Sequence, residues 1–146
     1  MGDVPNAISI LLVEDNPDDI EITRRALAQG RVINELTLAR DGQEALDILS
    51  AAKNGETRYP GLILLDLNLP KVDGREVLER IKTDPKLKRI PVVVLTVSTR
   101  EEDIVRSYDL GVNTFISKPV QFQEFIKVVT TLKEYWLLIA TLPPVE

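Results

Sequence analysis

The chain is 146 residues long, which suits one domain with a sizeable hydrophobic core. Its net charge of −5 argues against nucleic acid as a partner, because no basic surface is available to neutralise phosphates. The chain has neither cysteine nor histidine, which excludes disulfides, thiolate metal sites and an imidazole general base. Any chemistry must therefore use carboxylates, hydroxyls, lysine, arginine or the backbone.

The N-terminal segment "MGDVPNAIS" has neither a basic start nor a long apolar stretch, so we do not expect a signal peptide. The apolar run "YWLLIATL" near the C-terminus is too short to span a membrane. We therefore expect a cytoplasmic protein that does not interact with membranes.

The first predicted unit is a strand at residues 7–13 followed by a helix. The run "AISILLV" is apolar throughout, as in a strand that is buried on both faces. Asn16 is a good N-cap and Pro17 suits the first position of the helix, which we expect to continue through residue 29. A second, alternating strand is predicted at residues 35–39.

A capping-box pattern follows the second strand. Asp41 and Glu44 have the spacing of this pattern, so we expect a helix that begins there and ends near residues 54–55. Residues 61–66 then predict a third strand, and residues 74–82 predict a short helix with one apolar face.

The last two predicted strands are residues 90–96 and residues 113–117. We expect one helix between them, capped by Ser98, and a final helix that begins at about Gln121. Strict alternation of strands and helices predicts an open, doubly wound parallel sheet with helices on both faces. Ligands of such sheets bind beyond the carboxyl ends of the strands.

Polar side chains follow four of the predicted strands at this edge. Glu14 and Asp15 follow the first strand, and Asp66 ends the third. Thr96 ends the fourth strand, and Lys118 follows the fifth. Each residue alone has an ordinary structural explanation, such as helix capping or a solvated charge. Together they predict one site, because separate strands place them at the same edge.

Three carboxylates that lie close together repel one another unless a cation neutralises them. Mg²⁺ suits such a site, because it prefers a few carboxylates, water and phosphate oxygens. One carboxylate is then able to attack phosphorus and form an aspartyl phosphate. The Thr96 hydroxyl, the Lys118 ammonium group and loop amides near Asn68 are candidate donors to the phosphoryl oxygens.

These motifs resemble the receiver domain of two-component response regulators over roughly residues 8 to 133. The matching features are the pair Glu14-Asp15, Asp66 within "LLDLNLPKVDG", Thr96 after "VVVL", Phe115 three residues before Lys118, and the pair Lys118-Pro119. The resemblance implies a flavodoxin-like (βα)5 fold with strand order 2-1-3-4-5. It also implies a receiver domain at 7–133 and a C-terminal extension at 134–146. The expected function is that of a single-domain phosphoacceptor, loaded by a histidine kinase, rather than that of an enzyme.

The resemblance assigns a role to each residue of the metal site. Asp66 is expected to accept the phosphoryl group. Asp15 and Asp66 are expected to bind Mg²⁺ directly, with Mn²⁺ as the alternative ion. The backbone carbonyl of Asn68 completes the protein ligands, and Glu14 is expected to act through a water molecule.

The resemblance also assigns the residues that contact or sense the phosphoryl group. Thr96 and Lys118 are expected to contact it directly. Phe115 is expected to turn inward as Thr96 moves toward the phosphate. The peptide bond before Pro119 is expected to be cis, a conformation with a low free-energy cost only before proline.

The C-terminal extension contains more apolar side chains than one helix face can bury. We expect an interface formed by consecutive residues, Tyr135, Trp136, Leu137 and Leu138. A homodimer is the expected assembly, because like surfaces pair by two-fold symmetry. The extension and the acidic motifs look most like regulators that are paired with bacterial and cyanobacterial phytochrome kinases.

Two other functions use a similar sheet. A phosphohydrolase of the haloacid-dehalogenase type also has a nucleophilic aspartate at a strand end, but it needs a second aspartate where this chain has Asn68. A flavin-binding module needs a loop that binds phosphate after the first strand. The segment "EDNPDD" at that place is acidic and would repel phosphate.

Overall fold

The computed structural model describes residues 8–29, 34–96, 114–117 and 127 of the chain. The elements in chain order are β1 (Ile8–Val13), α1 (Pro17–Gln29), β2 (Asn34–Ala39), α2 (Gly42–Lys53), β3 (Leu62–Asp66), α3 (Gly74–Thr83), β4 (Val92–Thr96) and β5 (Thr114–Ser117). All five predicted strands are present, and their bounds differ from the prediction by at most two residues. The helix predicted after Ser98 lies outside the described residues, and of the helix predicted from about Gln121 the structure describes only residue 127, which is helical.

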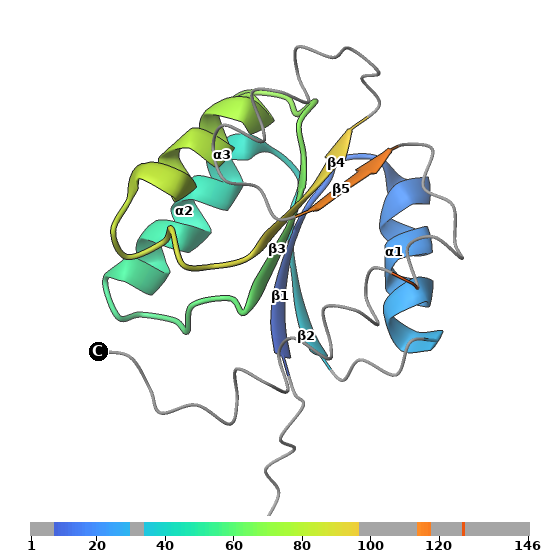
Figure 1. The fold of residues 1–146 in the computed structure, drawn as a ribbon, viewed down its shortest axis with the longest axis horizontal. Coiled ribbons are helices and arrows are strands. Elements are labelled where there is room, and N and C mark those ends of the chain that lie inside the picture. Colours follow the sequence, from blue (N-terminus) through green and yellow to red (C-terminus); the bar gives the residue numbers. More distant parts are fainter. Residues whose placement is uncertain (1–7, 30–33, 97–113, 118–126, 128–146) are drawn as a thin grey trace, which may run out of the picture.

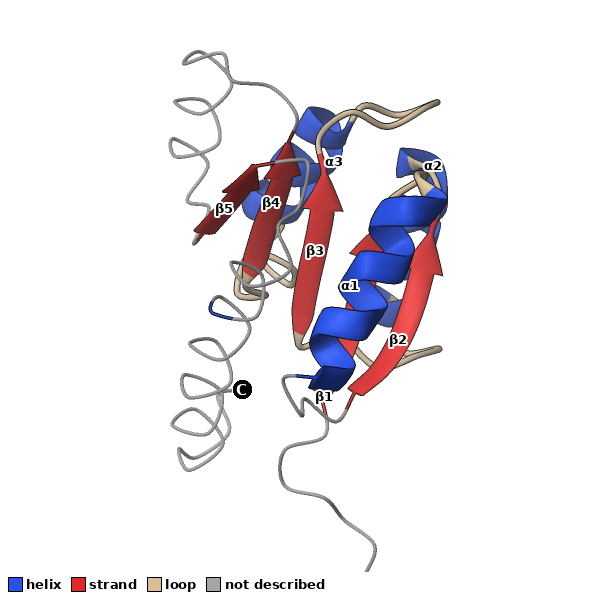
Figure 2. Cartoon of the chain, turned by 90° about the vertical axis from the view of Figure 1, so that its right-hand side faces the viewer, coloured by secondary structure: helices blue, strands red, loops and turns tan. Residues whose placement is uncertain are grey.

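The strands form one parallel sheet in the order β2-β1-β3-β4-β5, as the resemblance implied. Figure 2 shows the strands side by side with their arrowheads at the same edge. The chain moves from β1 to β2 on one side and then crosses to β3 on the other side of β1. Such a switch point leaves a crevice beyond the ends of β1 and β3, where ligands of open α/β sheets bind.

The described helices lie on both faces of the sheet. α1 covers one face, and α2 and α3 cover the other (Figure 1). Leu11, Val13 and Leu65 belong to the buried cluster beneath α2 and α3, whereas the intervening Leu12 points to the face of α1. All five residues of β3 are buried, which explains why its sequence is apolar without alternation. None of the helices in the described part of the chain is long and apolar enough to cross a membrane.

Side chains satisfy the free backbone N–H groups at the first turns of the helices. Asn16 Oδ1 accepts hydrogen bonds from the backbone N of Asp18 at 2.8 Å and of Asp19 at 3.3 Å. Asp41 Oδ1 accepts one from the backbone N of Glu44 at 2.8 Å. Both predicted caps are therefore confirmed.

Candidate functional site

The acids that follow β1 and β3 lie together at the carboxyl edge of the sheet. Val13 pairs with Leu65, so the next residues, Glu14 and Asp66, continue side by side. The carboxylate oxygens of Glu14, Asp15 and Asp66 lie within 4.8 Å of one another. The structure therefore brings together the three acids that the sequence predicted to converge.

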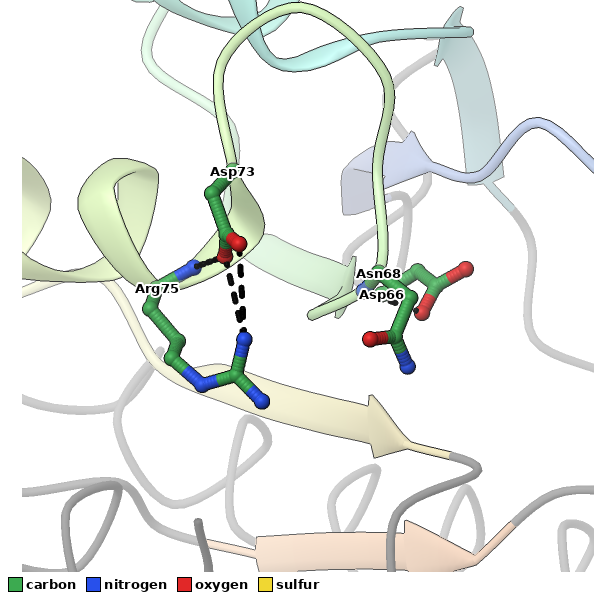
Figure 3. Close-up of polar contacts among 4 residues, drawn as sticks. All are labelled: Asp66, Asn68, Asp73 and Arg75. Carbon is green, nitrogen blue, oxygen red and sulfur yellow. Dashed lines mark hydrogen bonds and ion pairs between the residues drawn. The ribbon is translucent and has the colours of Figure 1, made fainter.

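Hydrogen bonds hold the backbone on either side of these acids. Glu14 is fully buried, and its backbone N donates to Ala39 O at 2.9 Å, which continues the pairing of β1 with β2. Asp66 is 2% exposed, and its Oδ1 accepts from the backbone N of Asn68 at 3.0 Å (Figure 3). Asp15 is exposed. Two of the three acids are thus buried at the ends of strands, and the third is exposed to solvent.

The donor atoms of this acid cluster fit a divalent cation that prefers oxygen ligands. Mg²⁺ binds oxygen at roughly 2 Å, so ligands on opposite sides of one ion are about 4 Å apart. Carboxylate oxygens within 4.8 Å of one another are near that spacing, and the exposed Asp15 side chain is able to move closer. A cation would also offset the repulsion between the two buried acids.

The loop after Asp66 is closed by short contacts at the start of α3. Asp73 caps this helix, because its Oδ1 accepts from the backbone N of Arg75 at 2.8 Å (Figure 3). Gly74 N donates to Leu67 O at 3.1 Å, and a Cβ on Gly74 would lie only 2.3 Å from Asp66 O. Glycine is therefore required here for close backbone approach, and Asp73 serves the helix rather than the acid cluster.

The remaining predicted site residues are only partly described. Leu95 pairs with Asp66, so the next residue, Thr96, ends β4 at the same edge of the sheet. Phe115 lies in β5 opposite Val94. For Thr96 and Phe115 the structure describes the backbone and not the side chains. The other predicted residues lie outside the described part of the chain, namely Lys118, Pro119, Tyr135, Trp136, Leu137 and Leu138.

The loop after Asp66 makes a contact with the start of α2 that the sequence did not predict. Lys71 Nζ lies 3.5 Å from Asp41 Oδ2. Asp41 was recognised only as a helix cap, and nothing in the sequence indicated this second partner. The hydrogen bond from the backbone N of Glu44, and to a lesser extent the charge of Lys71, lower the pKa of Asp41.

A cavity of about 470 Å³ lies elsewhere on the sheet. Its lining includes Ser9 at the start of β1, Glu35 in β2, and Arg58 and Pro60 in the loop before β3. The acid cluster follows the last residues of β1 and β3, so this cavity is a separate feature.

Comparison with known proteins gives a consistent result. The family profile described as response regulator receiver domain matches residues 10–130. The response regulator Rcp1 of Synechocystis sp. is 46% identical over 135 residues, which cover 92% of this chain and 92% of Rcp1. These matches support the receiver interpretation and give no support to the phosphohydrolase alternative.

Two solved structures are similar over nearly the whole chain. The phosphorylated cyanobacterial phytochrome response regulator RcpA has a TM-score of 0.79 and 50% identity, and the match covers 94% of this chain and 99% of RcpA. The Mn²⁺-bound form of Rcp1 has a TM-score of 0.78 and 44% identity, with 94% and 99% coverage. The fold, the acid cluster and these matches agree, and the chain belongs to the family of response regulator receiver domains.

Proposed function

We propose that this chain is a phosphoacceptor switch in which a histidine kinase transfers a phosphoryl group to Asp66. The observation that carries the proposal is the position of Asp66, buried at the end of β3 with the oxygens of Glu14 and Asp15 within 4.8 Å. Two buried acids beside a third, exposed one are costly unless positive charge offsets their repulsion, so a structural role alone explains the cluster poorly. The likeness to RcpA, solved in a phosphorylated form, supports the same function.

Mg²⁺ is the ion that we propose for the site. Asp15 and Asp66 would bind it directly, the Asn68 carbonyl would add a third ligand, and Glu14 would act through water. When bound, the ion supplies positive charge that attracts a phosphoryl oxygen and stabilises the charge that develops during transfer. Mn²⁺ is the alternative ion, and its presence in the solved form of Rcp1 supports a divalent site of this kind.

Asp66 acts as the nucleophile in the transfer. One of its carboxylate oxygens forms a bond to phosphorus while the bond from phosphorus to the donor nitrogen breaks. The imidazole of the kinase leaves with the bonding electron pair. An ionised carboxylate needs no general base, which fits a chain without histidine. We assign to Thr96 and Lys118 the hydrogen bonds that stabilise the phosphoryl oxygens.

The output of the switch is a changed protein surface. We propose that Thr96 moves toward the phosphoryl group and that Phe115 turns inward behind it, with a cis peptide bond before Pro119. The proposed receiver domain spans 7–133. The extension 134–146 would form a homodimer through a set of consecutive apolar residues, Tyr135, Trp136, Leu137 and Leu138.

The proposed kinase is a phytochrome, because the similar solved structure of RcpA is that of a phytochrome response regulator. The proposed compartment is the cytoplasm. The dimer is tested by light scattering over a range of concentrations, before and after phosphorylation. A monomer under every condition would remove the dimer from the proposal and leave the phosphoacceptor function untouched.

The phosphoacceptor function is tested with acetyl phosphate and Mg²⁺, followed by mass spectrometry of the intact chain. We expect a base-labile gain of one phosphoryl group, which disappears in Asp66→Asn and when EDTA removes the metal. Asp18→Asn is the matched control, because it makes the same charge change in the first turn of α1, outside the acid cluster. An undiminished adduct in Asp66→Asn, or no adduct in the parent chain, would refute the proposal.

A further inference from the structure

The loop that carries Asn68 is held from a second side, by the first residue of α2. Gly42 N donates to Pro70 O at 3.4 Å. A Cβ on Gly42 would lie 1.9 Å from Val72 O and 2.8 Å from Val72 Cβ. The backbone of α2 therefore touches the backbone of this loop at a distance that only glycine permits.

The same loop contains a strained residue at this contact. Lys71 has a φ of 64°, in the left-handed region that residues other than glycine adopt at a cost. Such a conformation persists where the surroundings enforce it. The ion pair with Asp41 contributes little to this, because the Lys71 side chain is 70% exposed. The packing of Pro70 and Val72 against Gly42 is the stronger constraint.

This contact lies close to the acid cluster along the chain. Between Asp66 and Gly74 the loop is fixed at its two ends by the hydrogen bond from Gly74 N to Leu67 O. Asn68, whose backbone N donates to Asp66, lies two residues before Pro70. A displacement of Pro70 or Val72 must therefore be absorbed within a few residues that include Asn68.

We propose that Gly42 is a positioning residue for the metal and phosphoryl site. Its lack of a side chain lets the start of α2 fix Pro70 and Val72, and through them the Asn68 backbone beside Asp66. The inference rests on the proposed function, because it assigns to Gly42 an effect on a metal that Asp66 and Asn68 bind. It adds a second anchor for the loop, on an element that contributes no ligand.

The test is the affinity for Mn²⁺, measured from the paramagnetic resonance signal of the free ion. Gly42→Ala should raise the dissociation constant about tenfold, which corresponds to about 1.4 kcal/mol of binding free energy. The reason is that the new Cβ must push the Val72 backbone away. Alanine is a better helix former than glycine, so a weaker α2 cannot be the cause.

Gly55→Ala is the matched control at the other end of the same helix. Gly55 has a φ of 81°, and a Cβ there would meet nothing within 4 Å. This variant should lose stability through its backbone conformation while binding Mn²⁺ as the parent chain does. The pair thus separates an effect on the site from a general loss of stability.

The Mn²⁺ affinities test the proposed function and the role of Gly42 separately. No Mn²⁺ binding by the parent chain would refute the proposed function itself. Binding by the parent chain and equal binding by Gly42→Ala would overturn the role of Gly42 alone. If Gly42→Ala does not fold, Val72→Ala tests the position of the same loop in another way. It keeps the Val72 atoms that face Gly42, and it removes the methyl groups that pack against the buried cluster and hold the loop in place. It should weaken Mn²⁺ binding about threefold, since the loop loses only part of its packing. Unchanged affinity would show that the position of this loop does not control the site and would overturn the inference.

Discussion

The two loops that flank β3 differ in how tightly they are packed. In the loop before β3, residues 54–59 are all exposed, Tyr59 is 40% exposed, and a Cβ on Gly55 would meet no atom within 4 Å. In the loop after β3, Leu67 is fully buried, and a Cβ on Gly74 would lie 2.3 Å from Asp66 O. Both glycines are in loops or at helix ends, but only Gly74 has no room for a side chain.

This difference shows where the fold needs fixed geometry. The loop before β3 only has to connect α2 to the sheet, so its backbone has space. The loop after β3 has to place Asn68 beside Asp66, and it is packed against the first residues of both α2 and α3. Between the two loops, the five buried residues of β3 form a rigid base for the site.

The largest expected effect that tests this comparison comes from Gly74→Ala. The new Cβ would collide with the backbone of Asp66 and Leu67, which no side-chain rotation relieves. We expect a loss of about 3 kcal/mol in the free energy of unfolding, at the upper end of what overpacking costs. Urea unfolding followed by circular dichroism measures it. A loss below that of Gly55→Ala would show that the loop after β3 is not the tighter one.

Gly55→Ala should have a smaller effect, because only the backbone conformation resists the substitution. We expect a loss of about 1 kcal/mol, which is the usual cost of a left-handed conformation in a residue with a Cβ. Acetyl phosphate should still phosphorylate this variant at the parent rate, measured from the time course of adduct formation. A slower rate would mean that the loop before β3 also influences the site.

Substitutions at Asp73 should show whether its helix-capping oxygen or its negative charge contributes more to stability. Asp73→Ala removes the acceptor for the backbone N of Arg75 and should cost about 1 kcal/mol of stability. Asp73→Asn keeps a capping oxygen and should cost only a few tenths of a kcal/mol. Thermal unfolding of both variants measures the difference. Equal losses would indicate that the charge matters more than the cap.

The smallest expected effect is on the pH dependence of the free energy of unfolding, through Asp84 at the end of α3 and Asp41 at the start of α2. The hydrogen bond from Lys53 lowers the pKa of Asp84, and the hydrogen bond from the Glu44 backbone N lowers that of Asp41. A carboxyl with a lowered pKa in the folded state stabilises the fold above its unfolded value near 3.8. This stabilisation is lost as the pH falls below that value through the folded pKa.

The urea midpoint should therefore fall between pH 4 and pH 2, and it should fall less in Asp84→Asn and in Asp41→Asn. Asp84 belongs to the end of α3 away from the site, whereas Asp41 lies beside the loop after β3. An unchanged acid response in both variants would show that neither carboxyl contributes. If only one of the two variants shows a smaller fall in the urea midpoint, the carboxyl replaced in that variant is the one that makes the fold sensitive to acid.

The sequence was sufficient to predict the convergence of Glu14, Asp15 and Asp66, because strand ends fix their positions. Each of the two apolar runs ends just before an acid, at Val13 and at Leu65, and these two residues pair in the sheet. The contact of Gly42 with Val72 was not predictable in this way. It depends on how closely the start of α2 approaches the loop after β3, and no pattern of residues in the sequence predicts that distance.

Small errors in the predicted elements also have physical causes. Ile90 was assigned to the fourth strand, but its backbone N donates to Leu87 O at 3.0 Å, so Ile90 completes the preceding turn. Pro91 has no N–H and only accepts, from Ile63 N at 3.0 Å, which delays the strand to Val92. The predicted capping box is shifted by one residue, because the Glu44 side chain accepts from the backbone N of Arg40 rather than from that of Asp41.

The most direct test is to identify the carboxylate that carries the phosphoryl group. The chain is phosphorylated with acetyl phosphate in Mg²⁺, the acyl phosphate is reduced with borohydride, and the modified residue is located by peptide mass spectrometry. We predict modification at Asp66 alone, with none when the metal is removed. Modification at Asp15, at Glu14 or at an acid outside the cluster would contradict the assignment of Asp66 as the acceptor.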